Sequence, residues 1–428
     1  MHVEWCWKVK KMQQGYKQTE IGVIPADWEI CVAKDLYLKA RIGWQGLKKD
    51  EYLDDGDYYL VTGTDFLDNK ISWKNCHYVS QERYDQDKNI QLSTGDILIT
   101  KDGSIGKTAF VDILDKPATL NSGIFLVRPK NDKIDTAYLY FVFKSEYFNK
   151  FLNDLTAGST IVHLYQKDFV AFKYPLPKRK EQEQIAKAII DVDSMISSLE
   201  KLIEKKKAIK QGAMQELLTG KKRLQGFAGE WKKYKLGDLC CISGRIGFRG
   251  YTKKDIVNKG FGAITFSPSD IFDQKIDYSN CDYISFFKYE ESPEIQVFNG
   301  DIIFCKTASI GKTALIKNLA EKATINPQFV LINNFKCNNK FLYYIISGKE
   351  FVEQILSITG GSTIPTISQE QLKLQLISMP TIEEQDAIAS ILSDMDNEIE
   401  ALEHKLEKTR QIKQGMMQQL LTGKIRLV

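Results

Sequence analysis

Apolar residues recur with an alternating four-three spacing along two long stretches, 181–218 and 384–421, neither of which contains proline. This spacing defines a narrow a/d seam, which is typical of helices that pair along their length. At about 1.5 Å per residue, each stretch of about 38 residues predicts a helix about 57 Å long. The predicted seam positions are Ile185, Ile189, Val192, Ile196, Leu199 and Ile203 in the first helix, and Ile388, Leu392, Met395, Ile399, Leu402 and Leu406 in the second.

Both stretches are charged on most of their other faces, so a single helix of this kind needs a partner for its seam. The matching seams favour an antiparallel coiled coil between the two helices of one chain. In the alternative, each helix packs only on the globular part that precedes it. Pro177 and Pro380 stand just before the two stretches and can end the preceding element.

The chain is an internal duplication with a shift of 203 to 205 residues. Segment 94–109 returns at 299–314, and segment 41–46 returns at 245–250. A repeat this long is a complete module with its own core rather than one unit of a solenoid. Two such modules in one chain predict a pseudo-two-fold internal repeat.

Outside the long helices, each copy mixes strand-like and helix-like segments. Short runs rich in Ile, Val and Phe, such as 96–100 and 301–306, are bounded by turn-forming residues and predict strands. Segments 136–155 and 340–358 carry apolar and aromatic residues at helical spacing. We therefore expect an α+β fold, in which two homologous globular α/β domains with largely antiparallel sheets are separated by two long antiparallel coiled-coil helices.

Composition and charge exclude several classes of protein. The 428 residues are 43% hydrophobic and 27% charged, which excludes a disordered or collagen-like chain. No apolar run reaches the roughly 18 residues of a membrane span, and the N-terminus lacks a secretory signal, so we expect a cytoplasmic protein with no membrane partner. The net charge of +4 is too mild to identify a polyanionic partner by itself.

Metal and catalytic chemistry find little support in the sequence. None of the eight cysteines forms a Cys-x-x-Cys pair, and the four histidines are scattered singly. The repeated Ser-Ile-Gly-Lys-Thr at 104–108 and 309–313 lacks the earlier glycine of a Walker A loop, because Lys101 and Lys306 stand in its place. We expect no metal, no cofactor and no catalytic residue.

A second partial motif lies at 326–329, where the sequence Asn-Pro-Gln-Phe is similar to the Asn-Pro-Pro-aromatic loop with which adenine methyltransferases bind a flipped base. The equivalent segment of the first copy, 121–124, does not match this motif, and the sequence has no glycine-rich cofactor loop after a predicted strand. We interpret it as a structural turn.

Binding chemistry has more support, because similar residue types recur at equivalent places in both copies. Arginine and glutamine can read base edges bidentately, while lysine and small hydroxyl groups can hold phosphates. Solvated turns with ordinary surface charges are the alternative. The candidate DNA-binding residues are Arg41, Trp44, Gln45, Lys48, Lys101, Ser104, Lys107, Ser159 and Thr160 in the first copy, and Arg245, Arg249, Lys253, Lys306, Ser309, Lys312, Ser362 and Thr363 in the second.

Taken together, these features resemble the specificity subunit of type I restriction-modification systems, over nearly all of the chain after about residue 20. The resemblance is carried by four marks. Two of them belong to the long helices: a Pro-x-x-x-Glu-Gln sequence at their starts, 177–182 and 380–385, and a Leu-Leu-Thr-Gly-Lys sequence at their ends. The other two are segment 21–28, where the first copy begins, and segment 226–231, where the second copy begins.

The resemblance implies five segments along the chain. An N-terminal extension, 1–20, departs from the family pattern and includes Met12 as an alternative start. The others are target recognition domain 1 (21–176), a central conserved helical region (177–222), target recognition domain 2 (223–379) and a C-terminal conserved helical region (380–428).

The resemblance also implies a function without catalysis. Each recognition domain reads one part of a split DNA sequence, and the helical regions act as a ruler and dock other subunits. The implied partners are double-stranded DNA, two methyltransferase (modification) subunits and restriction subunits, which carry the chemistry and its cofactors. Because the two copies have diverged, we expect two different half-sequences separated by a spacer of fixed length.

Two other functions stay open at this point. One is a non-DNA scaffold, in which a coiled coil presents two protein-binding heads. The other is the recognition part of a different modification system, whose methyltransferase and nuclease lie in a single separate chain.

Overall fold

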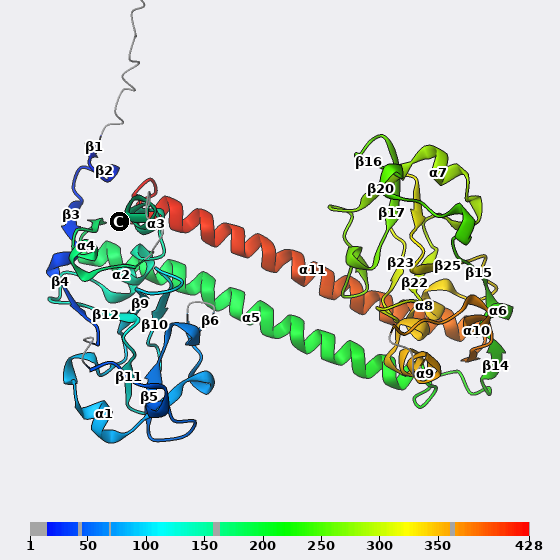
Figure 1. The fold of residues 1–428 in the computed structure, drawn as a ribbon, viewed down its shortest axis with the longest axis horizontal. Helices are drawn as coiled ribbons and strands as arrows, with labels where there is room; N and C mark the ends of the chain where they lie inside the picture. Colours follow the sequence, from blue (N-terminus) through cyan, green and yellow to red (C-terminus); the bar gives the residue numbers. More distant parts are fainter. Residues whose placement is uncertain (1–14, 42–44, 68–69, 157–162, 360–363, 428) are drawn as a thin grey trace, which may run out of the picture. The chain divides into compact units, whose positions relative to one another are not determined.

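The computed structural model describes residues 15–41, 45–67, 70–156, 163–359 and 364–427. The chain forms two compact units, which we describe separately (Figure 1). Unit 1 consists of residues 1–199 and 405–428, and unit 2 consists of residues 200–404. The two long helices, α5 (Arg179–Leu217) and α11 (Ile382–Leu420), each begin in one unit and end in the other.

Unit 1 contains a six-stranded sheet in the order β4-β12-β9-β10-β7-β6, a three-stranded sheet in the order β11-β5-β8, and two strand pairs, β1-β2 and β13-β3. Its strands are β1 (Tyr16–Thr19), β2 (Gly22–Pro25), β3 (Glu29–Val32), β4 (Leu36–Lys39), β5 (Tyr58–Val61), β6 (Phe66–Leu67), β7 (Lys70–Ile71), β8 (His77–Val79), β9 (Ile97–Thr100), β10 (Thr108–Phe110), β11 (Ala118–Leu120), β12 (Ile124–Pro129) and β13 (Lys173–Leu176). Its short helices are α1 (Gln81–Asp85), α2 (Thr136–Val142), α3 (Glu146–Thr156) and α4 (Gln166–Phe169).

Unit 2 repeats this plan with a four-stranded sheet in the order β15-β25-β22-β23, a five-stranded sheet in the order β16-β20-β17-β24-β21, and the pairs β14-β26 and β18-β19. Its strands are β14 (Lys232–Lys235), β15 (Cys241–Ser243), β16 (Ile256–Val257), β17 (Gly262–Phe266), β18 (Ile271–Phe272), β19 (Lys275–Ile276), β20 (Asp282–Ser285), β21 (Gln296–Val297), β22 (Ile302–Cys305), β23 (Thr313–Leu315), β24 (Ala323–Ile325), β25 (Phe329–Asn333) and β26 (Leu376–Met379). Its short helices are α6 (Leu236–Leu239), α7 (Phe286–Glu290), α8 (Asn339–Ser347), α9 (Lys349–Thr359) and α10 (Gln369–Lys373). The expected α+β fold of two homologous domains with two long helices is confirmed. Most strand pairs are antiparallel, with parallel pairs at β5-β11, β7-β10 and β17-β24.

The central sheet of each unit lies between two hydrophobic cores. In unit 1, Ile97 and Ile99 of β9 face the core that includes the long helices, whereas Leu98 faces the core of the three-stranded sheet. In unit 2, Ile302 and Phe304 of β22 face the helical core, and Ile303 faces the other. Because both faces are covered, these strands are continuous apolar runs without polar alternation.

The long helices pair antiparallel within each unit, as the seams predict. In unit 1 the end of α11 packs beside the start of α5 in one core, and Lys413 Nζ lies 2.5 Å from Asp193 Oδ1 (Figure 1). In unit 2 the end of α5 packs beside the start of α11, and Lys210 Nζ lies 2.5 Å from Asp396 Oδ1. All twelve predicted seam side chains are buried or half-buried. Each unit therefore takes one helix end from the other copy, and the alternative of packing on one head alone is wrong.

The Leu-Leu-Thr-Gly-Lys motif ends both long helices by the same device. Gly220 and Gly423 adopt the left-handed conformation, each with φ of +69°. The amide of Ile425 donates to the carbonyl of Gln419 (3.2 Å), and the amide of Lys222 donates to that of Glu216 (3.1 Å). These bonds satisfy carbonyls that a helix end leaves open, and a glycine adopts the required φ without strain.

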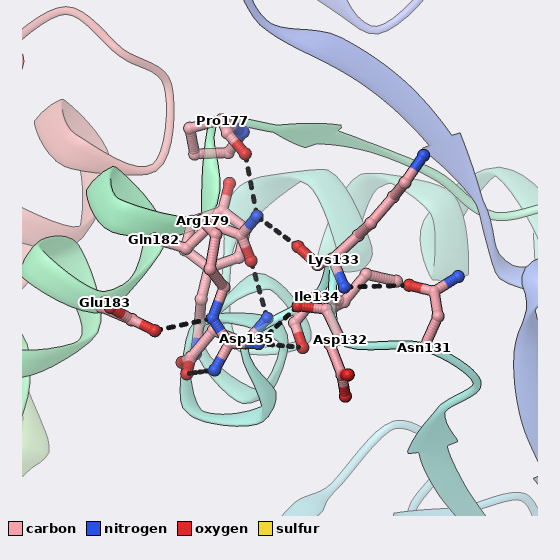
Figure 2. Close-up of polar contacts among 10 residues, drawn as sticks. Asn131, Asp132, Lys133, Ile134, Asp135, Pro177, Arg179, Gln182 and Glu183 are labelled. Atoms are coloured by element: carbon pink, nitrogen blue, oxygen red, sulfur yellow. Dashed lines mark hydrogen bonds and ion pairs between the residues drawn. The ribbon is translucent and has the colours of Figure 1, made fainter.

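A glutamine fixes the start of each long helix to its head. Gln182 is fully buried; its Nε2 group donates to the carbonyls of Lys133 (2.9 Å) and Pro177 (2.8 Å), and its Oε1 accepts from the amide of Asp135 (2.7 Å) (Figure 2). Arg179 also binds this loop, because its guanidinium donates a hydrogen bond to the carbonyl of Ile134 (Figure 2). In unit 2, Gln385 repeats the bonds to Pro380 and to the amide of Asn338.

The glutamate that precedes each of these glutamines is also buried, and it binds an arginine just past the end of the other long helix. In unit 1, Glu181 accepts hydrogen bonds from Arg426 (2.6 and 2.9 Å) and from the indole of Trp28 (3.1 Å). Arg426 also contacts Asp27 and holds the pKa of that carboxyl below its usual value. In unit 2, Glu384 accepts two bonds of 2.7 Å from Arg223.

Among the described residues, no helix combines the length and apolar composition that crossing a membrane requires. Within the same ranges, no group of three or more histidine, cysteine, aspartate or glutamate side chains is placed to hold a metal ion.

We expect Gln182→Leu to lower the free energy of unfolding of unit 1 by about 3 kcal/mol, because three buried backbone groups lose their hydrogen-bond partner. Denaturant unfolding followed by circular dichroism measures this loss. Gln184→Leu is the matched control, since the buried Oε1 atom of Gln184 has no hydrogen-bond partner among the described residues. Equal unfolding curves for the two variants would contradict the role of Gln182.

Candidate nucleic-acid interface

Loops that are distant in the sequence meet beside the end of β9 and the start of β12, two inner strands of the central sheet of unit 1. The amide of Lys101 donates to the carbonyl of Gly123 (2.9 Å), and its carbonyl accepts from the amide of Leu164 (2.9 Å). The amide of Asn121 donates in turn to the carbonyl of Val61 (3.0 Å). The backbone of Lys101 therefore joins the turn after β11 to the segment before α4.

Unit 2 joins its equivalent loops in the same way. The amide of Lys306 donates to the carbonyl of Gln328 (2.8 Å), and its carbonyl accepts from the amide of Ile367 (3.0 Å). The amide of Asn326 donates to the carbonyl of Phe266 (3.0 Å). We call each set of joined loops the loop surface of its unit. Its described residues are 41, 45, 62–65, 101–107, 121–123 and 163–165 in unit 1, and 245–251, 267–270, 306–312, 326–328 and 364–367 in unit 2.

Arg41 anchors the first of these loops from inside the protein. Its side chain is only 2% exposed, and Nε donates to the carbonyl of Leu120 (2.8 Å). Its terminal nitrogens donate to Thr119 Oγ1 (3.2 Å) and to the carbonyl of Gln45 (3.5 Å). Burial lowers the pKa of the Arg41 guanidinium from its ordinary value.

Arg245 has the same role in unit 2. It donates to the carbonyl of Ile325, to Thr324 Oγ1 (3.2 Å) and to the carbonyl of Arg249 (3.4 Å). Two guanidinium groups that the sequence suggests as base readers are thus engaged with protein carbonyls. We leave Arg41 and Arg245 out of the DNA contacts proposed below.

A short acidic turn closes the neighbouring loop in both units. Asp65 accepts hydrogen bonds from the amide (2.7 Å) and the hydroxyl (2.9 Å) of Thr62. Asp270 accepts the same two bonds from Ser267, at 2.7 and 3.0 Å. Burial raises the pKa of both carboxyl groups. These residues are framework for the loop surface rather than part of its exposed face.

The repeated Ser-Ile-Gly-Lys-Thr segment packs closely on a helix. Gly106 has φ of +80°, and a Cβ placed on it would lie 2.2 Å from Leu152 of α3. Gly311 has φ of +92°, and its Cβ would lie 2.6 Å from Val352 of α9. Each glycine serves a turn and a close packing contact, and strand β10 or β23 follows the segment. The geometry differs from a phosphate loop, which leads into a helix.

The remaining candidate residues fall into three groups. Lys48, Ser104, Lys107, Lys253 and Ser309 are exposed, and Lys101 and Lys306 are half-buried. A second group is engaged within the protein: Lys312 donates to the carbonyl of Pro268 (2.7 Å), Arg249 lies 3.4 Å from Glu294, and Gln45 is buried. Trp44, Ser159, Thr160, Ser362 and Thr363 lie outside the described residues.

The structure also brings to the loop surface two side chains that the sequence analysis does not single out. His163 Nδ1 contacts Asp102 Oδ1 in unit 1, and both side chains are partly exposed. A position-by-position search for differences between the copies, rather than for likeness, would have found them. With ammonium groups, hydroxyls and this pair among its residues, the loop surface has the chemistry to contact both phosphates and base edges.

The family model of the type I restriction modification DNA specificity domain matches residues 25–211 and 228–412. The type I restriction enzyme MjaVIII specificity subunit of Methanocaldococcus jannaschii is 28% identical, over 97% of this chain and 97% of its own length. The MjaIX specificity subunit of the same organism is 22% identical, over 99% and 98%.

Two solved structures share the fold. The crystal structure of the type I restriction-modification S subunit from M. genitalium has a TM-score of 0.56 at 15% identity, covering 92% of this chain and 96% of that one. A chain from a structural study of the assembly and conformational transition of the type I R-M system has a TM-score of 0.55 at 16% identity, covering 94% and 99%.

We expect Arg41→Met to loosen the loop surface of unit 1, because the carbonyl of Leu120 and the hydroxyl of Thr119 lose their charged donor. Hydrogen exchange of segment 118–121 should quicken about tenfold or more, which corresponds to about 1.4 kcal/mol. Lys48→Met, which removes an exposed charge from the same region, serves as the control. Unchanged exchange in the Arg41 variant would show that the guanidinium does not anchor the loop.

Proposed function

The chain belongs to the type I restriction modification DNA specificity family, and we propose that its two units each read one half of a split DNA target. It is the DNA-recognition subunit of a type I restriction-modification system, without a catalytic site of its own. Family membership contradicts the non-DNA scaffold considered above.

The observation that carries the two-reader proposal is the duplicated loop surface. Lys101 in unit 1 and Lys306 in unit 2 join equivalent loops through equivalent backbone bonds. Ser104 and Ser309 are exposed in both units, but other positions on those loops differ, such as His163 in unit 1 and Thr366 in unit 2. Two similar frameworks with different surfaces suit two different half-sequences, and so an asymmetric site.

The long helices support a fixed spacer between the half-sequences. Helices α5 and α11 have 39 residues each and run without interruption from one unit into the other. A continuous helix changes length only when residues are added or removed, at about 1.5 Å per residue. We propose that helix length selects the spacer.

The partners follow from the family and from the repeat. Two similar copies offer two similar docking surfaces, which suits two methyltransferase subunits, with restriction subunits joining through the complex. The net charge of +4 is small for a protein that binds DNA alone, so we propose that the methyltransferase subunits supply many phosphate contacts. A cytoplasmic location remains a prediction.

We expect Lys101→Ala combined with Lys107→Ala to weaken duplex binding by the assembled methyltransferase complex about tenfold, and to lower its salt slope by about 2 if both contact phosphates. Fluorescence titration at several salt concentrations measures both quantities. Lys74→Ala with Lys88→Ala, which removes two exposed lysines away from the loop surface, should change neither. Unchanged affinity and slope in the first variant would exclude that loop from the interface.

We expect one heptad added to each long helix, after Leu199 and after His404, to lengthen the preferred spacer by about three base pairs, because seven residues add about 10.5 Å. Keeping the heptad preserves the seam. Methylome sequencing of a strain that carries the variant reads the spacer directly. Seven residues inserted after the exposed Gln225, outside both helices, are the control. A spacer that both insertions leave unchanged would refute the ruler.

A further inference from the structure

The two loop surfaces share a framework but differ at one pair of contacting residues. Position 102 in unit 1 corresponds to position 307 in unit 2, and position 163 corresponds to position 366, because Leu164 and Ile367 make the same bond to the lysine carbonyl. Unit 1 has an aspartate and a histidine there, and unit 2 has two threonines. The neighbouring Lys101 and Lys306 are identical.

In unit 1 the pair is presented at the surface. The side chains of Asp102 and His163 are 41% and 29% exposed, and His163 Nδ1 contacts Asp102 Oδ1. The ring of Tyr165 packs 4.4 Å from the ring of His163 and limits its orientations. Gly123 lies beside the carboxylate, since a Cβ placed on it would be in van der Waals contact with Asp102 Oδ2, at 3.7 Å.

In unit 2 the equivalent place has different chemistry. Thr307 and Thr366 pair through an isolated β-bridge, and Thr366 is exposed. Gln328 replaces the glycine, and its Oε1 accepts from Asn326 Nδ2 (3.1 Å). A carboxylate that only accepts has thus given way to hydroxyl and amide groups that also donate.

This difference bears on base reading. An ionised carboxylate accepts hydrogen bonds from an exocyclic amino group, such as N4 of cytosine, whereas hydroxyls are less selective. Lysines and backbone amides contact the phosphates and carry no sequence information directly. Residues shared by both surfaces cannot distinguish two half-sequences, but residues that differ can.

Building on the proposed function, we propose that Asp102 is a specificity-determining residue of unit 1, which accepts a hydrogen bond from the amino group of a base in the major groove. His163 is its positioning residue and holds the carboxylate through the contact between Nδ1 and Oδ1. Thr307 and Thr366 occupy the same place in unit 2 and give its half-sequence a different preference.

The test uses the specificity subunit assembled with its methyltransferase subunits. Methylation is measured on duplexes that vary one base pair at a time across the recognised site. In the double variant Asp102→Thr and His163→Thr, which installs the unit 2 pair, we expect the preference at one position of one half-sequence to fall about tenfold to a hundredfold. Preferences at all other positions should stay as in the original protein.

The chain offers a matched control in a second histidine-aspartate pair of unit 1. His77 Nδ1 lies 3.9 Å from Asp54 Oδ1, and neither residue belongs to the loop surface. Asp54→Thr with His77→Thr should leave every base preference unchanged. If the first double variant does not assemble, the isosteric single variant Asp102→Asn decides the question by the same measurement.

Preferences unchanged at every position, or changed in both half-sequences, would overturn the assignment of Asp102 and His163. A different result would show that the proposed function itself is wrong. In that case the original complex itself would show no preference for a split site, before any substitution is made.

Discussion

A buried carboxylate at the start of each long helix is the constraint on which the fold depends. Glu181 and Glu384 are both less than 5% exposed, and a charge so placed is costly unless a cation meets it. Arg426 and Arg223 provide the cations, and each lies just past the end of a long helix. Each unit is therefore complete only when it includes a helix end from the other copy.

This exchange explains why the repeat in the sequence and the unit in the structure have different boundaries. The copies follow one another along the chain, but unit 1 joins residues 1–199 to the chain's last segment. The Gly-Lys-x-Arg sequence at both helix ends performs two linked tasks. The glycine stops the helix, and the arginine three residues later reaches the partner glutamate. A motif repeated in the sequence thus marks a repeated physical contact.

The long helices were predictable because their information is local: the seam period, the absence of proline and the terminal glycine all lie within each stretch. The loop surface was only partly predictable. Arg41 and Lys101 do bond the same segment, 119–123, but which side chains face outward depends on tertiary contacts. The sequence suggests Arg41 as a DNA-binding residue, and the structure places its guanidinium against the carbonyl of Leu120, because a group that suits a base edge also suits backbone carbonyls. Sequence patterns alone do not distinguish these two partners.

The duplication offers a way to separate stability from recognition within a single sequence. At several positions where the copies have the same residue, the structure shows what that residue does for the fold. Arg41 and Arg245 donate to strand carbonyls, and Gly106 and Gly311 leave room for a neighbouring helix. Where they disagree on a shared framework, as at Asp102 and Thr307, folding does not require one particular residue. A protein that must hold two readers in one architecture can vary its target only at such positions. Likeness between the copies therefore fits folding and sequence-independent phosphate contacts, and difference at the loop surface fits the proposed reading of two half-sequences.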